Sequence, residues 1–151
     1  KDKLEVTLTA PAAGALYNAP AAVVLSAIAQ TTQKNHPIAK VEFFQGTSLV
    51  GSVTGPRAGD QYTLSWTGVA AGTYSLTAKA TNDKGDTDLS DPVSITVNAL
   101  PSVSLTSPDS NAAFKAPANI PLAVQVADTD GSIANVEYFY GTTSIISIRR
   151  G

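Results

Sequence analysis

Two aspartates in the sequence Asp128-Thr-Asp130-Gly131 have the residue type and spacing from which a calcium site can begin. Calcium is a hard cation that takes about six to eight oxygen ligands, and carboxylates are among its preferred ones. A complete site needs more donors than these two side chains supply. The same pattern is typical of an Asx-type turn with glycine in the left-handed conformation. We favour the turn and keep calcium at Asp128 and Asp130 as the alternative.

Four further aspartates lie close together in the chain, at Asp83, Asp86, Asp88 and Asp91. The stretch Asn82–Gly85 is typical of a hairpin turn. Paired carboxylates can hydrolyse glycosides, but they must flank a substrate cleft, whereas these belong to one loop. We therefore expect a solvated acidic loop, with calcium again the alternative.

Other catalytic groups are missing from the sequence. It has no cysteine and one histidine, His36, so it offers neither a thiol nucleophile nor the His and Cys sets that bind zinc. No serine lies in a nucleophile-elbow pattern. We expect that the protein is not an enzyme and needs no cofactor.

The apolar residues that must position these groups recur with a period of two. Such alternation over short runs predicts strands with one buried face. Turn-forming residues separate the runs, and no helical period is present. About seven short strands of this kind predict an all-β, immunoglobulin-like β-sandwich. The runs are Val6 and Leu8; Val23–Ala29; Val41 and Phe43; Tyr62–Trp66; Tyr74–Ala80; and Val93–Val97.

Aromatic residues fall both in and out of this alternation. Trp66 and Tyr74 are in phase with it, so we expect core packing rather than sugar stacking, with a hydrogen bond from the Tyr74 hydroxyl at a strand corner. Phe44 and Phe139 are out of phase and are predicted to face outward. An exposed aromatic can bind a sugar or a neighbouring domain. The alternative, which we favour, is partial cover by an adjacent strand.

The chain contains a long internal repeat. Val6–Pro11 returns as Val103–Pro108 with an offset of 97 residues, and Ile38–Phe44 returns as Ile133–Phe139 with an offset of 95. We therefore predict one complete domain, residues 1–98, and a truncated second copy, residues 99–151, which is the N-terminal half of the repeat.

The second copy contains counterparts of only the first four strands: Ser102–Ser107, Ile120–Ala127, Ile133–Tyr140 and Thr143–Ile148. Nothing corresponds to the strands of Trp66, Tyr74 and Val93–Val97. The loss should expose two strand edges and half a core. Roughly 50 residues without a disulfide or a metal are marginal for independent folding. We expect the copy to fray or to be completed through another chain.

These motifs give a resemblance. The segments Tyr62–Trp66, Ala71–Ala78 and Val93–Val97, with the repeat above, resemble the bacterial immunoglobulin-like modules found in tandem in secreted multi-modular glycoside hydrolases and surface adhesins. The resemblance implies a spacer or stabilising partner beside a carbohydrate-active or adhesive domain, in a secreted or cell-surface protein. A carbohydrate- or protein-binding module is the alternative.

Composition excludes other classes. The net charge is -2 and the 10 basic residues are scattered, so we expect no binding to nucleic acid. No apolar run approaches the roughly 20 residues that span a bilayer. The absence of methionine suggests a piece of a longer chain or a processed form. The expected partners are neighbouring domains of that chain, and self-association through the incomplete repeat.

Overall fold

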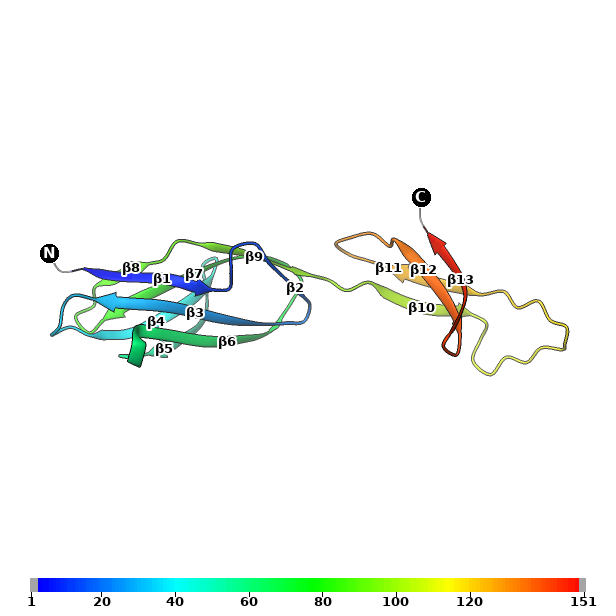
Figure 1. Ribbon diagram of the computed structural model, residues 1–151, viewed down its shortest axis with the longest axis horizontal. Coiled ribbons are helices and arrows are strands. Elements are labelled where there is room, and N and C mark those ends of the chain that lie inside the picture. Colours follow the sequence, from blue (N-terminus) through cyan, green and yellow to red (C-terminus); the bar gives the residue numbers. More distant parts are fainter. Residues whose placement is uncertain (1–2, 150–151) are drawn as a thin grey trace. The chain divides into compact units, whose positions relative to one another are not determined.

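The computed structural model of the protein describes residues 3–149. The chain divides into two compact units, Lys1–Asn98 (unit 1) and Ala99–Gly151 (unit 2). Both consist of strands joined by turns (Figure 1). The all-β prediction is confirmed, and the one helical feature described is a 3₁₀ turn, η1, at Ala58–Asp60.

Unit 1 is a sandwich of two sheets. The first has the order β1-β3-β6, and the second has the order β2-β9-β7-β4-β5 with β8 paired to β7. The strands are β1 (Leu4–Ala10), β2 (Ala15–Asn18), β3 (Ala21–Thr31), β4 (Ile38–Gln45), β5 (Ser48–Thr54), β6 (Gln61–Val69), β7 (Gly72–Asn82), β8 (Thr87–Leu89) and β9 (Val93–Asn98). Between the sheets, β1 lies against β7 and β8, β3 against β4, and β5 against β6.

The core of unit 1 follows from the alternation, since successive strand residues point to opposite faces of a sheet. In β3, for example, Val23, Leu25 and Ala27 are buried, and Val24 between them is exposed. The fully buried residues from the other strands include Val41, Phe43, Tyr62, Leu76 and Ile95. No buried side-chain polar atom in the described residues lacks a hydrogen-bond partner.

Two strands of unit 1 were not expected. β2 is four residues long and pairs in parallel only with β9, while β8 is three residues long and pairs only with β7. Runs this short show almost no alternation of apolar and polar residues, so the sequence does not predict them. They form strands because a neighbouring strand supplies their hydrogen bonds.

Unit 2 contains β10 (Ser102–Ser107), β11 (Ala123–Ala127), β12 (Asn135–Tyr140) and β13 (Thr143–Arg149), which form two separate antiparallel pairs. The β10–β11 pair repeats the register of β1–β3, including the irregularity near its end. The β12–β13 pair repeats the register of β4–β5 in the same way, with Tyr138 opposite Ile146 where Phe43 is opposite Gly51. The sequence repeat is therefore a structural repeat.

Two segments of unit 2 do not repeat unit 1. The strand expected over 120–127 begins only at Ala123, and residues 112–115, the counterparts of β2, form no strand. In unit 1 the first half of β3, residues 21–25, pairs only with β6, and β2 pairs only with β9. Unit 2 has no counterpart of β6 or β9 among its described residues. Without a strand that pairs with their N–H and C=O groups, these segments do not form strands.

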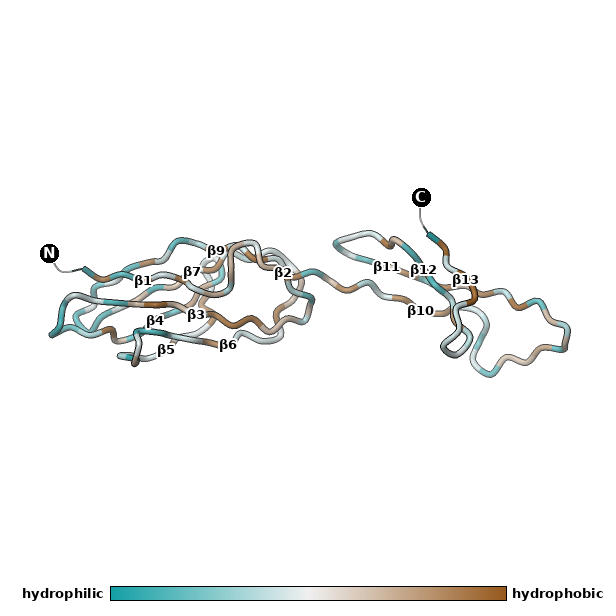
Figure 2. Tube along the Cα trace, viewed as in Figure 1, coloured by the Kyte–Doolittle hydropathy of each residue, from teal (hydrophilic) through white to brown (hydrophobic). Residues whose placement is uncertain are grey.

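Unit 2 also leaves its apolar face open, as the sequence predicts. None of its residues from 99 to 149 is buried. Val103 is 69% exposed where its counterpart Val6 is 6% exposed, and Leu122 is 38% exposed where Leu25 is 0% exposed. Figure 2 shows apolar, brown segments in β10 and β13 as well as in the strands of unit 1.

Candidate functional site

The aspartates considered for calcium in unit 2 are engaged with the backbone. Asp128 Oδ1 accepts a hydrogen bond from the Asp130 amide at 3.3 Å, and Asp130 Oδ2 accepts one from the Ala99 amide at 2.7 Å. The first contact is the predicted Asx-type turn. The predicted left-handed conformation of Gly131 is wrong, because Gly131 does not have a positive φ. A Cβ on Gly131 would lie 2.7 Å from Asp128 Oδ2, so a side chain there would require the Asp128 carboxylate to move.

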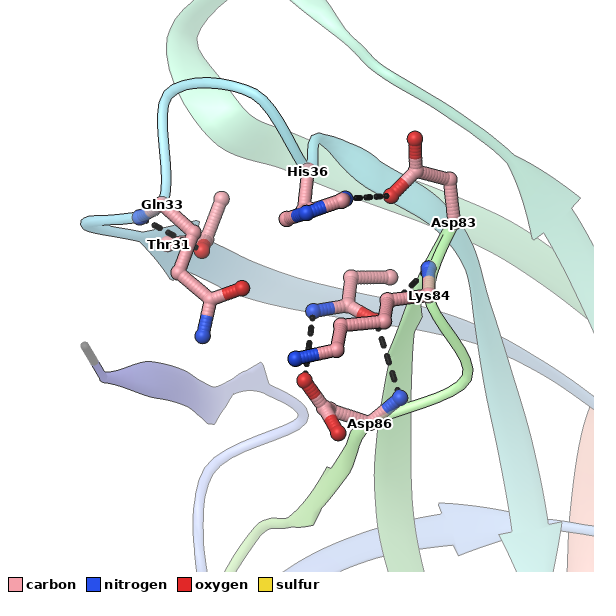
Figure 3. Close-up of polar contacts among 7 residues, drawn as sticks. Thr31, Gln33, His36, Asp83, Lys84 and Asp86 are labelled. Carbon is pink, nitrogen blue, oxygen red and sulfur yellow. Dashed lines mark hydrogen bonds and ion pairs between the residues drawn. The ribbon is translucent and has the colours of Figure 1, made fainter.

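The acidic loop of unit 1 is organised by a buried amide (Figure 3). Asn82 is buried, and its Oδ1 accepts hydrogen bonds from the amides of Lys84 at 3.1 Å and Asp86 at 2.8 Å. This is the predicted turn between two strands, with Gly85 at φ 98°. Outside it, His36 Nδ1 lies 2.9 Å from Asp83 Oδ1. The hydrogen bonds from backbone amides to the Asn82 side chain therefore explain the shape of the loop.

The remaining carboxylates of this region do not converge. Asp88 Oδ2 accepts a hydrogen bond from the Val6 amide at 2.9 Å, which ties β8 to β1. Across residues 3–149, no three side chains of His, Cys, Asp or Glu are grouped so that they could hold a metal ion. Calcium binding at Asp128 and Asp130 stays a prediction, with two carboxylates as its only visible side-chain donors.

Phe44 lies on the outer face of the five-stranded path of unit 1. It is partly buried, and it lines a shallow depression together with Thr77, Lys79 and Leu89 of the neighbouring strands β7 and β8. In the ladder it pairs with Thr77 on one side and with Leu49 on the other. A planar ring beside hydroxyl and ammonium groups is a surface on which a sugar or a partner residue can rest.

Phe139, the counterpart of Phe44, is 56% exposed. Its strand β12 pairs only with β13, so the side that β7 covers in unit 1 is open here. Phe139 lines a groove of about 640 Å³ whose other walls are the unpaired core residues of unit 2. The two phenylalanines thus share a position in the repeat and differ in what surrounds them. This geometry does not test whether the two phenylalanines bind a ligand, so binding at Phe44 or Phe139 remains a prediction.

Trp66 and Tyr74 pack against the core of unit 1 from its margin. Their rings meet edge to face, with centroids 5.2 Å apart and an angle of 83° between planes. The Tyr74 hydroxyl donates to the Ala70 carbonyl at 2.7 Å, which confirms the predicted corner hydrogen bond. Core packing is confirmed in part, since both rings are only partly buried and the fully buried aromatic of β6 is Tyr62.

The open groove of unit 2 is lined mainly by apolar side chains. Its apolar walls come from both strand pairs and from the coil between them: Val103, Leu105, Ile120, Leu122, Val124, Tyr138, Phe139 and Ile145. The strands β11 and β12 each have one paired neighbour, whereas β3 and β4 each have two. The groove therefore lies beside two open strand edges.

Comparison with models of protein families shows the family to which the chain belongs. A model of the bacterial Ig domain matches residues 5–78 and again residues 101–149. The chain belongs to the bacterial Ig domain family. The two matched segments correspond to the two copies of the repeat, which agrees with the resemblance drawn from the sequence.

A solved structure supports the same fold. The bacterial Ig chain is similar to the fibronectin(III)-like modules of CbhA from Clostridium thermocellum, with 33% sequence identity and a TM-score of 0.52, over 62% of this chain and 94% of that one. Comparison with curated proteins gave no match. The structural likeness confirms an immunoglobulin- or fibronectin-like β-sandwich.

Bacterial Ig and fibronectin(III)-like modules are generally non-catalytic and often extracellular. The described residues include no helix that is long and apolar enough to cross a membrane. A structural module is therefore the coarse function that the relatives support.

Proposed function

We propose that this chain is a non-catalytic structural or spacer module of a secreted or cell-surface multi-domain protein, beside a carbohydrate-active or adhesive domain. The observation that carries the proposal is the packing of unit 1. Its two sheets bury a continuous apolar core, and the side chains of Asp88 and Asn82 accept hydrogen bonds from backbone amides of a strand and a turn. Such an arrangement supports a structural role, and we infer no set of catalytic groups among the described residues of unit 1.

The proposal also agrees with the surface of unit 1. The carboxylates near its acidic loop have separate partners, so they do not face one cleft: Asp88 accepts a hydrogen bond from the Val6 amide, Asp86 accepts one from Asn82 Nδ2, and Asp83 lies 2.9 Å from His36 Nδ1. Fold alone does not assign function. The proposed neighbours are expected because modules of the family that the chain resembles stand beside such domains.

A second candidate function is a carbohydrate- or protein-binding module. The depression around Phe44 favours it, because the ring lies beside Lys79 and Thr77 on an outer sheet face. It would need no cofactor and would use stacking and hydrogen bonds alone.

A glycan array probed with the whole chain separates the two functions. The spacer function predicts no glycan above background. Binding that disappears in Phe44→Ala would replace it with the second function. The matched control is Leu49→Ala, which removes the cross-strand neighbour of Phe44 and leaves the ring in place.

Two kinds of partner follow from the proposed function. Neighbouring domains of the parent chain are the first. The second is self-association through unit 2, whose strand β11 carries neither a charge nor a proline that would guard its edge. Light scattering across a concentration series tests self-association, and a mass that stays monomeric at every concentration argues against it.

A further inference from the structure

The chain enters unit 1 at one end of the sandwich and leaves it at the other. Leu4, the first residue of β1, pairs with Thr31 at the end of β3, whereas Val97 of β9 pairs with Gly72 at the start of β7. From there β7 runs the length of the sheet to Asn82, beside the start of β4. Figure 1 shows β1 beginning and β9 ending at opposite ends of the unit. A pull between these two points therefore acts along the strands.

The N-terminal segment of unit 1 is fastened to both sheets. β1 pairs with β3 in the first sheet, and after residues 11–14 β2 pairs with β9 in the second. The free edge of β1 is held as well, because the Val6 amide donates a hydrogen bond to Asp88 Oδ2 of β8 at 2.9 Å. A pull on this segment therefore meets resistance in each sheet.

The β2–β9 ladder is the one parallel ladder among the described strands. Two hydrogen bonds extend it, from the Gly14 amide to the Ser94 carbonyl and from the Ala19 amide to the Asn98 carbonyl, each at 2.8 Å. Because the strands are parallel, a pull on the start of β2 and on the end of β9 slides them past each other. The hydrogen bonds run across this direction, so all of them are loaded together.

The inner face of this ladder is covered by apolar side chains. Ala15 and Tyr17 of β2 pack against the core, and Ile95 and Val97 of β9 are 0% and 1% exposed. Sliding the two strands apart would therefore expose apolar surface as well as break hydrogen bonds. Both costs arise in the same movement, which favours resistance to a pull along the strands.

We propose that unit 1 is a load-bearing link, in which the parallel β2–β9 ladder resists tension between the two ends of the unit. The inference rests on the proposed spacer function, because a spacer transmits any force that acts on its neighbours. Forced unfolding is governed by the rate of unfolding rather than by equilibrium stability. The direction of the pull should therefore decide how much force the unit bears.

The absence of cysteine allows force to be applied at chosen residues of the whole chain. Pairs of introduced cysteines serve as attachment points for handles in optical tweezers. Lys3→Cys with Asn98→Cys pulls along the strands. Lys40→Cys with Thr54→Cys, at opposite residues of the β4–β5 ladder, pulls two strands apart one hydrogen bond after another. At one loading rate, we expect the folded unit to bear about twofold or more force in the first geometry.

A change in the ladder itself tests its location. Amides that face a partner strand recur at every second residue, so after Gly14 the next amide of β2 that faces β9 is that of Leu16. Leu16→Pro removes this amide, and Leu16→Ala, the matched control, keeps it. The Leu16 side chain is 71% exposed, so neither change empties the core. In the first geometry the force should fall by roughly half in Leu16→Pro and stay native in Leu16→Ala.

A second control separates resistance to force from equilibrium stability. Ile38→Val removes a buried carbon atom from β4, which β7 separates from β9 in the sheet. It should lower the midpoint of urea denaturation and leave the force in the first geometry nearly unchanged. The fluorescence of Trp66 in urea shows whether each variant is folded. If Leu16→Pro does not fold, the two geometries compared in the native sequence still decide.

Three results would overturn the inference. One is equal force in the two geometries. Another is a folded Leu16→Pro variant that bears as much force as Leu16→Ala. The third is a loss of force in Ile38→Val as large as in folded Leu16→Pro, which would mean that force follows equilibrium stability. Glycan binding through Phe44 would replace the spacer function and leave these forces unchanged, so the two failures are distinguishable.

Discussion

In unit 1, a hydrogen bond and a ring contact of Tyr74 hold the turn between β6 and β7. Tyr74 closes a hydrogen bond to the carbonyl of Ala70, four residues earlier, while its ring edge meets Trp66 of the opposite sheet. The phase of both aromatics in their strands predicts that they pack inward, but it does not predict that their rings meet. Their incomplete burial was not predictable, because it depends on how far the other strands extend over them.

Removing the Tyr74 hydroxyl should lower stability. In Tyr74→Phe the Ala70 carbonyl loses its donor and the ring contact with Trp66 remains. We expect a loss of about 1 kcal/mol in the free energy of unfolding. Urea denaturation followed by the fluorescence of Trp66 measures it. Tyr17→Phe is the matched control, because the Tyr17 hydroxyl makes no hydrogen bond to any described residue, and it should change stability by less than about 0.5 kcal/mol.

Tyr62 should make unit 1 sensitive to alkali. Burial raises the pKa of Tyr62 above its ordinary value of 10.0, so the folded state holds this proton more firmly than the unfolded state. The contribution to stability is fully present below pH 10.0 and is lost as the pH rises through the folded pKa. Tyr62→Phe should show a smaller loss of unfolding free energy between neutral and alkaline pH than the native chain. An equal loss in both proteins would contradict the assignment.

Calcium should not stabilise unit 2. The carboxylates of Asp128 and Asp130 already accept backbone hydrogen bonds, and the described residues bring no third acidic side chain to them. We expect the same thermal midpoint with millimolar calcium as with a chelator. A rise in the midpoint that disappears in Asp128→Asn would restore the metal site.

At the scale of elements, pairing partners decide which segments become strands. The runs with clear alternation, such as Tyr74–Ala80, are strands in the structure. The counterparts of β2 and of the first half of β3 form strands only in unit 1. In unit 2 Pro121, which has no backbone N–H to donate, replaces Val24. The sequence pattern gives the potential for a strand, and the neighbour completes its hydrogen bonds.

The β5–β6 contact should be intolerant of a side chain at Gly51. In Gly51→Ile the new side chain would overlap Leu64, and we expect a loss of about 1–3 kcal/mol from unit 1. The reverse change at the counterpart position, Ile146→Gly, should leave the unit 1 transition unchanged. Urea denaturation with Trp66 as the reporter measures both, and an unaltered midpoint in Gly51→Ile would show that β5 can move away at little cost.

At the scale of the whole molecule, one copy of the repeat closes a core and the other does not. Unit 1 has both sheets of its sandwich, whereas unit 2 has two separate strand pairs and no buried residue between 99 and 149. With no buried side chain, residues 99–149 gain little free energy to offset the conformational entropy of ordering them.

Hydrogen exchange should therefore divide the chain in two. Amides of β3, β4 and β7 should exchange only through global unfolding of unit 1, and those of β10 to β13 should exchange much faster. The denaturant dependence of unfolding should match the surface of unit 1 alone. Equal protection in both units would mean that unit 2 is completed by pairing in solution.

The sequence by itself determined the repeat, the all-β class, the inward phase of residues such as Leu25 and Phe43, and which strands of unit 1 have counterparts in residues 99–151. These follow from periodicity and from counting counterparts, which are local properties of the chain. The tertiary structure decided where strands begin and end, where each carboxylate finds its donor, and that Ile146 stands where Gly51 leaves a hole. Those depend on atoms that are distant in the sequence and meet only when sheets pack, so no local pattern encodes them.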